Sequence, residues 1–313
     1  MIRNALSLFD GMSCGRHALE RAGIPFGIYY ASEIDKAAVA VSQKNYPNTV
    51  QLGTVERWKE WDLQDVDLIM GGSPCQGFAA QGEQLAFDDP RSVLFFTMVD
   101  IIKHYKPKYF LLENVRMRKE WEGIITKYMG VEPIPICSSL VSAQRRQRLF
   151  WVNWDTSQPK NKQIHLSTIL ESDKMTHPGF IAGRKINRET GKREDHNPAV
   201  KRIQTLEVNK DHSKMCCLTT VEKDSVLTPL PSGRHLDAFE VLEKGKDWRY
   251  LTVRECERLQ TLPDDYTKAT GVSDRQRKKM LGNGWTVDVI VHILEQAVGI
   301  KPVVRGQRTL FEW

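Results

Sequence analysis

The architecture of the chain is set near its start by Leu6-Ser-Leu-Phe-Asp-Gly-Met-Ser-Cys-Gly15, an apolar run that passes into a glycine-containing turn. The apolar run is typical of a buried strand, and residues 16–22 follow it with helical spacing. Glycines in such a turn let the backbone approach a ligand closely, and a helix N-terminus presents free N–H groups. The stretch lacks a full GxGxxG pattern, which disfavours a dinucleotide pyrophosphate site. We predict a strand–turn–helix unit that either binds a ligand or keeps its glycines for packing alone.

The same alternation of apolar runs and helical patterns continues through the first half of the chain. It predicts strands at residues 4–8, 28–32, 49–52, 68–71, 109–112, 133–137 and 148–153, and helices at 16–22, 36–46, 92–105 and 121–129. Alternation at this spacing is typical of a mostly parallel, doubly wound α/β sheet. The predicted strands are apolar on both faces, as buried parallel strands are.

Composition divides the chain into four segments. Residues 1–154 form the alternating core, and residues 155–247 are polar, weakly periodic and expected to be irregular. Residues 248–300 return to the core, with helices expected at 252–261 and 287–298, and residues 301–313 form a short basic tail. The basic run within the second segment is either a solvated loop or a surface that faces phosphates.

The overall composition excludes several classes of protein. With 313 residues, 41% hydrophobic and 27% charged, the chain is typical of a folded globular protein. Its formal net charge of +6 permits a polyanionic partner without requiring one. We expect no membrane span and no signal peptide, because no sufficiently long apolar run is present. The six cysteines form no CxxC pair, which favours a reduced intracellular protein over a disulfide or zinc scaffold.

Two candidate site residues follow predicted strands. Glu33 ends the second strand, where an acid can hydrogen-bond ribose hydroxyls; an acid that merely starts a helix is the alternative. Cys75 lies in Gly71-Gly-Ser-Pro-Cys-Gln-Gly-Phe78, directly after a buried strand. A thiolate at such a turn is a candidate nucleophile, whereas a lone cysteine is more often a small buried hydrophobe. The flanking glycines and proline favour the exposed turn.

Two later segments carry charge at the edges of apolar strands. Leu111-Leu-Glu-Asn-Val115 places Glu113 at the end of a strand, where it is either a proton donor to a ligand or an acid held by an arginine. Gln144-Arg-Arg-Gln-Arg148 leads into the last predicted strand. Strand alternation directs Arg146 and Arg148 to the same face, where they would hold an anion or a carbonyl oxygen.

Taken in order, these segments resemble the motifs of the cytosine-C5 DNA methyltransferase family. Each motif alone is weak, but eight of them in order over one chain are specific. They are Phe9-Asp-Gly11 with Gly15, Ser32-Glu33, Ser73-Pro-Cys-Gln76, Asp89-Pro-Arg-Ser-Val-Leu-Phe95, Glu113-Asn-Val115, Gln144-Arg-Arg-Gln-Arg148, Arg249-Tyr-Leu-Thr252 and Leu281-Gly-Asn-Gly-Trp-Thr-Val287. The Gly-Trp pair and Val141-Ser-Ala143 are similar to the eukaryotic de novo branch, and the compact length fits a bacterial or phage origin. Met12-Ser-Cys14 departs from the family's cofactor loop. We therefore expect this stretch to contact the cofactor through its backbone and not through its side chains.

The resemblance implies a Rossmann-like methyltransferase fold and S-adenosylmethionine as the methyl donor, with S-adenosylhomocysteine as product and no metal. It implies that Cys75 adds to C6 of a flipped-out cytosine in duplex DNA. Glu113 would bind N3 and the exocyclic amine, and Arg146 and Arg148 would hold the carbonyl oxygen. Residues 155–247 would recognise the target. By the same resemblance the cofactor is bound by Phe9, Asp10, Gly11, Met12, Ser13, Cys14, Glu33, Ile34, Asn283, Gly284 and Trp285.

Three other functions remain open: a tRNA-directed methyltransferase of the same family, a nucleotide-level enzyme similar to thymidylate synthases, and a catalytically silent DNA-binding relative. The joint presence of Cys75, Glu113 and Glu33 argues against the silent relative. The tail Gln307-Arg-Thr-Leu-Phe-Glu-Trp313 is similar to peptides that dock on sliding clamps, or else folds back on the core. A bacterial or phage protein would work in the cytoplasm or at the nucleoid, within or outside a restriction–modification system. The DNA target, the oligomeric state and the base that removes the C5 proton are not set by the sequence.

Overall fold

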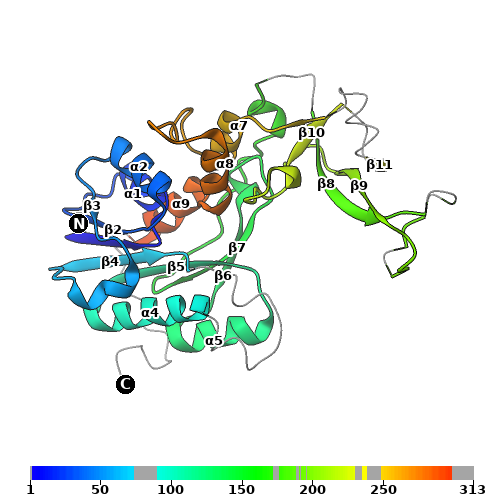
Figure 1. The fold of residues 1–313 in the computed structure, drawn as a ribbon. Coiled ribbons are helices and arrows are strands. Elements are labelled where there is room, and N and C mark those ends of the chain that lie inside the picture. Colours follow the sequence, from blue (N-terminus) through cyan, green and yellow to red (C-terminus); the bar gives the residue numbers. More distant parts are fainter. Residues whose placement is uncertain are drawn as a thin grey trace.

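The computed structural model describes residues 2–73, 90–171, 176–187, 190, 192–194, 196–229, 235–237 and 248–297. Cys75 and the clamp-like tail lie outside the described residues, so both predictions about them stay predictions. Two sheets organise the described part of the chain: a larger one between helical layers and a smaller one that extends away from them (Figure 1). Within the described ranges, no helix is long and apolar enough to cross a membrane.

The larger sheet has seven described strands in the order β3-β2-β1-β4-β5-β7-β6. Neighbours from β3 to β5 run parallel, whereas β7 is antiparallel to both β5 and β6. This arrangement confirms the predicted mostly parallel, doubly wound α/β sheet. The strands are β1 (Asn4–Leu8), β2 (Tyr29–Ser32), β3 (Val50–Gln51), β4 (Val66–Gly71), β5 (Tyr109–Val115), β6 (Ile134–Cys137) and β7 (Gln147–Val152).

Helices cover both faces of this sheet (Figure 1). On one face lie α1 (Cys14–Arg21), α2 (Lys36–Asn45) and α9 (Val287–Ala297), and on the other lie α4 (Pro90–Tyr105) and α5 (Lys119–Met129). Successive strand residues therefore enter different cores: Leu68 and Met70 pack on one side, and Ile69 between them packs on the other. The described residues also form short 3-10 helices: η1 (Val55–Glu60), η2 (Ser138–Leu140), η3 (Leu166–Thr168) and η4 (Glu222–Asp224).

Two further helices, α7 (Val253–Leu259) and α8 (Asp274–Asn283), lie between the larger sheet and the smaller one (Figure 1). Helix α8 was absent from the predicted elements because it is strongly polar. Its start carries a capping box: the Gln276 N–H donates to the Ser273 hydroxyl oxygen, and the Ser273 N–H donates to the Gln276 side-chain oxygen. That Ser-x-x-Gln spacing is the sequence signal that would have revealed the helix.

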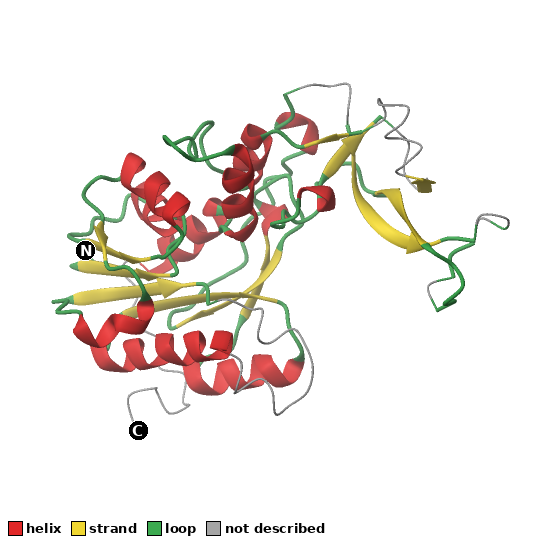
Figure 2. Ribbon diagram, in the orientation of Figure 1, coloured by secondary structure: helices red, strands yellow, loops and turns green. Residues whose placement is uncertain are grey.

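The expectation that residues 155–247 are irregular was wrong. Four strands of an antiparallel sheet form there, and β12 just beyond this segment completes the order β11-β9-β8-β10-β12 (Figure 2). Its core is a small cluster of Ile181, Leu206, Val208 and Val226, with Trp248 packed against it. So few apolar residues leave little periodic signal in a polar segment. The strands are β8 (His177–Lys185), β9 (Arg202–Val208), β10 (Val226–Thr228), β11 (His235–Asp237) and β12 (Arg249–Tyr250).

A segment that follows β9 ties the smaller sheet to the larger one. The backbone of Met215 accepts a hydrogen bond from the Arg145 N–H at 2.8 Å and donates one to the Ala143 carbonyl at 2.7 Å. The Lys214 ammonium donates to the carbonyls of Ser139 and Ser142, at 2.9 and 2.8 Å. Buried carbonyl groups lose their hydrogen bonds to water, and the ammonium group supplies hydrogen bonds in their place. The chain before β7 is thereby held against the smaller sheet.

Helix α7 begins at a buried acid that links both parts of the structure. Glu255 is fully buried and accepts two hydrogen bonds from the Arg249 guanidinium, both 2.7 Å long. The backbone N–H groups of Thr252 and Glu171 also donate to its carboxylate, at 2.8 and 3.0 Å. Burial raises the pKa of Glu255, but the hydrogen bonds together lower it by more than burial raises it. The pKa therefore lies below its ordinary value.

We expect Glu255→Gln to lower the free energy of unfolding by about 2–4 kcal/mol at pH 7, because Arg249 then loses its charged partner. A carboxylate with a depressed pKa stabilises the fold only while it is ionised. The loss should therefore shrink as the pH falls below the ordinary value of 4.5 and through the folded-state pKa. Urea unfolding of both proteins at pH 7 and pH 3.5 measures this difference. Glu60→Gln, in an exposed pair with Arg57, is the control and should change little.

Candidate active site

The carboxyl ends of β4 and β5 bring two predicted segments together, since Gly71 pairs with Leu112 in parallel register. Just beyond β4, the carbonyl and hydroxyl oxygens of Ser73 accept hydrogen bonds from the Asn114 amide, at 3.5 and 3.3 Å. Asn114 directly follows Glu113. Ligands bind at this edge of open α/β sheets. The chain therefore leaves β4 toward Cys75 from a point anchored beside Glu113.

Glu113 is held on both carboxylate oxygens. Arg148 Nε donates to Oε1 at 2.9 Å, and the indole N–H of Trp285 donates to Oε2 at 3.1 Å. Glu113 is buried, with 8% of the residue exposed, and these two bonds fix the plane of its carboxylate. Of the two alternatives left open by the sequence, the acid held by an arginine is present in the structure, and it does not exclude a role toward a ligand. An ionised carboxylate offers about four lone-pair positions, and the described residues occupy two of them.

The two arginines of the predicted motif differ in their partners. The Arg146 guanidinium is 3% exposed and donates to the backbone carbonyls of Leu218, Gly282 and Gly284, at 2.8, 3.0 and 2.8 Å. Arg148 instead turns its Nε to Glu113. Both guanidinium groups face the sulfur of Cys217, which lies 3.3 Å from Arg146 Nη1 and 3.8 Å from Arg148 Nη2. They thus meet on one side, but Arg146 binds carbonyls of distant segments, whereas Arg148 binds Glu113 and, through Nη1, the carbonyl of its neighbour Gln147 at 2.8 Å. A contact of either with a substrate stays a prediction.

The turn after β1 has an unusual backbone. Phe9, Gly11 and Ser13 have positive φ values of 56°, 59° and 64°. The Gly11 N–H donates to Glu33 Oε2 at 2.7 Å, and the N–H groups of Ile34 and Asp35 donate to Glu33 Oε1 at 2.7 and 2.8 Å. Glu33 thus joins the end of β2 to the turn, and the described residues occupy three of its about four lone-pair positions.

The side chains in this turn point inward. Ser13 donates to Asp10 at 2.6 Å, and Met12 and Cys14 are buried at 1% and 3% exposure. A Cβ atom on Gly284 would lie only 2.6 Å from the methyl carbon of Met12, so the loop after α8 packs tightly on the turn. Burial raises the pKa of the Cys14 thiol to about 12, which keeps it an unreactive thiol. The side chains of residues 12–14 are therefore buried in the protein and not turned toward solvent.

Asp10 is buried within the turn and accepts hydrogen bonds from Ser13 and, at 2.8 Å, from the Tyr29 hydroxyl. Burial raises its pKa to about 6 in spite of these donors. The acid therefore titrates only slightly below neutral pH.

We expect the wild-type protein to lose about 2 kcal/mol of stability relative to an Asp10→Asn variant between pH 4 and pH 8. The folded state binds the Asp10 proton more tightly than the unfolded chain, whose pKa is 3.8, so ionisation above about pH 6 opposes folding. Urea unfolding of both proteins at the two pH values measures the change. A difference in stability that does not vary with pH would contradict this assignment.

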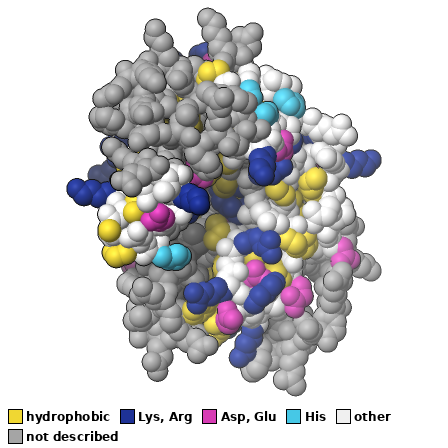
Figure 3. All heavy atoms as spheres, turned by 90° about the vertical axis from the view of Figure 1, so that its right-hand side faces the viewer, with side chains coloured by type: hydrophobic (Ala, Val, Ile, Leu, Met, Phe, Trp, Pro, Cys, Tyr) yellow, Lys and Arg dark blue, Asp and Glu magenta, His cyan; other side chains and the backbone are white. Residues whose placement is uncertain are grey.

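A pocket of about 670 Å³ separates the smaller sheet from α8. Arg275, Lys278 and Lys279 line one wall, together with Asn283, and Tyr250 and Leu218 belong to the opposite side. Figure 3 views the molecule from the side of the smaller sheet and shows Lys and Arg side chains gathered around a hollow. Positive charge along such a hollow attracts phosphate groups.

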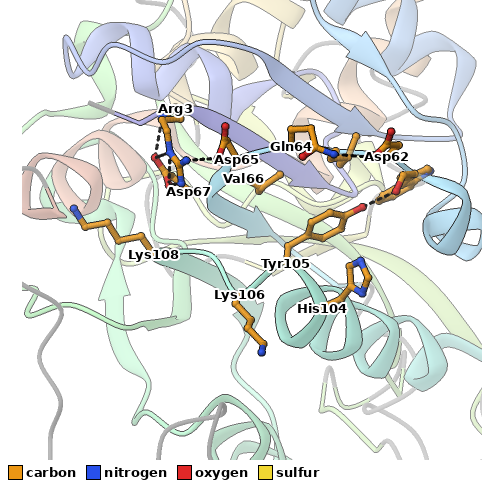
Figure 4. A pocket seen from close by; sticks show the side chains of 12 residues that line it. Arg3, Asp62, Gln64, Asp65, Val66, Asp67, His104, Tyr105, Lys106 and Lys108 are labelled. Atoms are coloured by element: carbon orange, nitrogen blue, oxygen red, sulfur yellow. Dashed lines mark hydrogen bonds and ion pairs between the residues drawn. The ribbon is translucent and has the colours of Figure 1, made fainter.

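A second pocket, of about 610 Å³, lies at the opposite edge of the larger sheet, where β1, β4 and β5 begin (Figure 4). Arg3 there is paired with Asp65 and with Asp67, at 2.9 Å in the second case. None of the predicted site residues line it. Among the described side chains, no cluster of three or more His, Cys, Asp or Glu could hold a metal ion.

Two contacts of this site have no signal in the sequence. Cys217 reaches the arginines from the segment between the two sheets, and no motif or periodicity marks it. The hydrogen bond from Trp285 to Glu113 joins residues 172 positions apart, although Trp285 itself was singled out as a cofactor residue. Both contacts arise from packing between distant segments.

The chain matches the family model described as C-5 cytosine-specific DNA methylase over residues 3–124 and 136–299. This match covers most of the chain, which therefore belongs to that family. The chain is 30% identical to the type II methyltransferase M1.ScrFI of Lactococcus lactis subsp. cremoris, over 94% of this chain and 78% of that protein. It is 28% identical to M.NlaX of Neisseria lactamica, over 93% of this chain and 95% of that protein.

Solved structures show the same fold. The Entamoeba histolytica methyltransferase EhMeth superposes with a TM-score of 0.68 at 18% identity, over 95% of this chain and 98% of that one. A Spodoptera frugiperda DNMT2 mutant gives a TM-score of 0.63 at 22% identity, over 94% and 98%. The Rossmann-like methyltransferase fold implied by the motifs is thus confirmed.

Proposed function

We propose that the chain is a DNA methyltransferase that methylates C5 of a cytosine turned out of duplex DNA. The observation that carries the proposal is the carboxylate of Glu113, fixed by Arg148 and Trp285 at the carboxyl edge of the sheet, beside the segment that leads to Cys75. Family membership supports the reaction class. The names of the type II relatives support DNA as the substrate and a place in a restriction–modification system.

The turn after β1 fits S-adenosylmethionine. Gly11 faces open space, since a Cβ atom there would meet nothing within 4 Å, and the exposed side chain of Ile34 offers an apolar surface beside the Glu33 acid. An acid next to an apolar surface suits a ribose joined to an adenine ring. We propose that Phe9, Glu33 and Ile34 bind the nucleoside. The backbone of residues 10–14 and of 283–285 then surrounds the amino acid end.

The chain's own residues then perform four tasks. The Cys75 thiolate adds to C6 of the cytosine, and Glu113 delivers a proton to N3, so that the electron pair accumulates on C5. Arg148 stabilises the developing charge near the carbonyl oxygen, while Arg146 holds the surrounding backbone. S-adenosylmethionine, when bound, supplies an electrophilic methyl group to C5. Loss of the C5 proton to a base and departure of the thiolate from C6 restore the pyrimidine ring.

The smaller sheet and the basic hollow supply a surface for the DNA. The cytosine must leave the helical stack for C6 to reach a thiol, which costs a few kcal/mol. Contacts from Arg275, Lys278 and Lys279 to phosphates would offset that cost. We propose that residues 155–247 read the target sequence, as the sequence analysis expects.

The test is methyl transfer from radiolabelled S-adenosylmethionine to duplex DNA, tRNA and free dCMP, followed by base-resolution sequencing of the methylated cytosines. We expect labelling of duplex DNA at a recurring sequence. Preferential labelling of tRNA would replace DNA by RNA as the substrate, labelling of dCMP would favour a nucleotide-level enzyme, and no labelling at all would refute the proposal.

A further inference from the structure

Trp285 lies where the candidate cofactor turn and the candidate base-binding acid meet. It follows Gly284, whose carbonyl accepts from the buried Arg146 and whose Cα faces the methyl group of Met12. The loop between α8 and α9 is therefore fixed on two sides. From this fixed loop the indole N–H of Trp285 reaches Glu113 Oε2 at 3.1 Å.

The end of β4 is shaped around this hydrogen bond. A Cβ atom on Gly72 would stand 2.9 Å from Glu113 Oε2 and 3.2 Å from Trp285 Nε1. Any larger residue at position 72 would push apart the two atoms that share the bond. Gly72 is three residues before Cys75. The indole, the carboxylate and the start of the nucleophile segment are therefore packed as one unit.

We propose that Trp285 is a positioning residue that holds the Glu113 carboxyl in the orientation needed for catalysis. This inference rests on the proposed function, because it assigns Glu113 to the cytosine. Arg148 alone would anchor one oxygen and leave the carboxyl plane free to turn about that bond. The second anchor on the other oxygen removes this freedom.

The number of remaining lone pairs supports this role. Among the described residues, Arg148 occupies one position on Oε1 and Trp285 one position on Oε2, so each oxygen has one further lone-pair position for a ligand. The edge of a cytosine presents N3 and an exocyclic amine side by side. Protonated Glu113 can then donate to N3 from one oxygen and accept from the amine with the other.

The test variant is Trp285→Phe, which keeps an aromatic ring in the loop and removes the N–H donor together with the five-membered part of the indole. We expect the single-turnover rate of methyl transfer to fall about 10-fold or more, a part of the gain that a well-placed general acid provides. The dissociation constants for S-adenosylmethionine and for DNA, and the melting temperature, should stay close to those of the wild type. A purely structural role would move these quantities instead.

Trp151→Phe is the matched control, since it also removes a buried indole donor, in this case the 3.0 Å bond to Thr126. We expect it to leave the rate within about twofold. In a Glu113→Ala background, Trp285→Phe should cause no further loss, because the group that it positions is already absent.

A direct readout of the contact is the indole resonance of Trp285 in protein labelled with ¹⁵N-tryptophan, identified by its disappearance in Trp285→Phe. Glu113→Ala should shift this resonance. The inference is overturned if the resonance does not move, if Trp285→Phe retains the wild-type rate, if it slows both backgrounds equally, or if its whole effect lies in cofactor affinity. A wild-type protein that methylates nothing would instead show that the proposed function itself has failed, and the positioning role with it.

Discussion

Replacing Cys75 by serine should abolish methyl transfer, with a loss on the order of 10⁴-fold or more, while leaving the fold and cofactor binding intact. A serine hydroxyl is almost fully protonated near neutral pH and is a much weaker nucleophile than a thiolate. Without addition at C6, C5 of cytosine does not become electron-rich enough to accept a methyl group. Turnover is measured on duplex DNA with labelled S-adenosylmethionine, and folding by the melting temperature.

The matched control is Cys137→Ser, at a free thiol on β6 outside the proposed machinery. It should retain wild-type turnover. DNA that carries 5-fluorocytosine provides a second readout. A base cannot remove the C5 fluorine as it removes the C5 proton, so the covalent adduct is trapped. We expect a covalent protein–DNA species with the wild type and none with Cys75→Ser. Wild-type-like turnover in Cys75→Ser would refute the nucleophile assignment.

Glu113→Gln should lower the rate of methyl transfer by about 10²–10⁴-fold, the range that a positioned general acid contributes. Glutamine fills the same space and can still accept from Arg148, but it cannot donate an acidic proton to N3. Affinity for S-adenosylmethionine should change little, because Glu113 faces the arginine and the indole and not the turn after β1. Rapid-quench single-turnover kinetics separates the chemical step from binding.

Glu122→Gln is the control for this experiment, since Glu122 is also a buried acid held by a cation, here Lys119 on the surface of α5. It should leave the rate unchanged. If Glu113→Gln kept the wild-type rate, then the acid would serve only to hold Arg148, and protonation of N3 would need another group.

Much of the fold could be predicted because its signals are local. Apolar runs and helical spacing within ten or so residues set the larger sheet, and the strand bounds differ by only a few positions. The strand β5, for example, continues through Val115 beyond the predicted end at residue 112, because pairing with β7 protects a polar strand end that periodicity alone does not recognise. The second sheet was missed for the opposite reason: its apolar core has few residues and comes from strands far apart in the chain.

The sequence by itself determined the family, the order of the motifs and the candidate residues Glu33, Cys75 and Glu113, because residue type and spacing along one chain carry that information. Only the tertiary structure decided which partners those residues have. Arg146 and Arg148 are two positions apart, yet one binds backbone carbonyls and the other binds Glu113. That choice depends on where the loop after α8 and the segment at Cys217 come to lie, and packing between distant segments leaves no local pattern in the sequence.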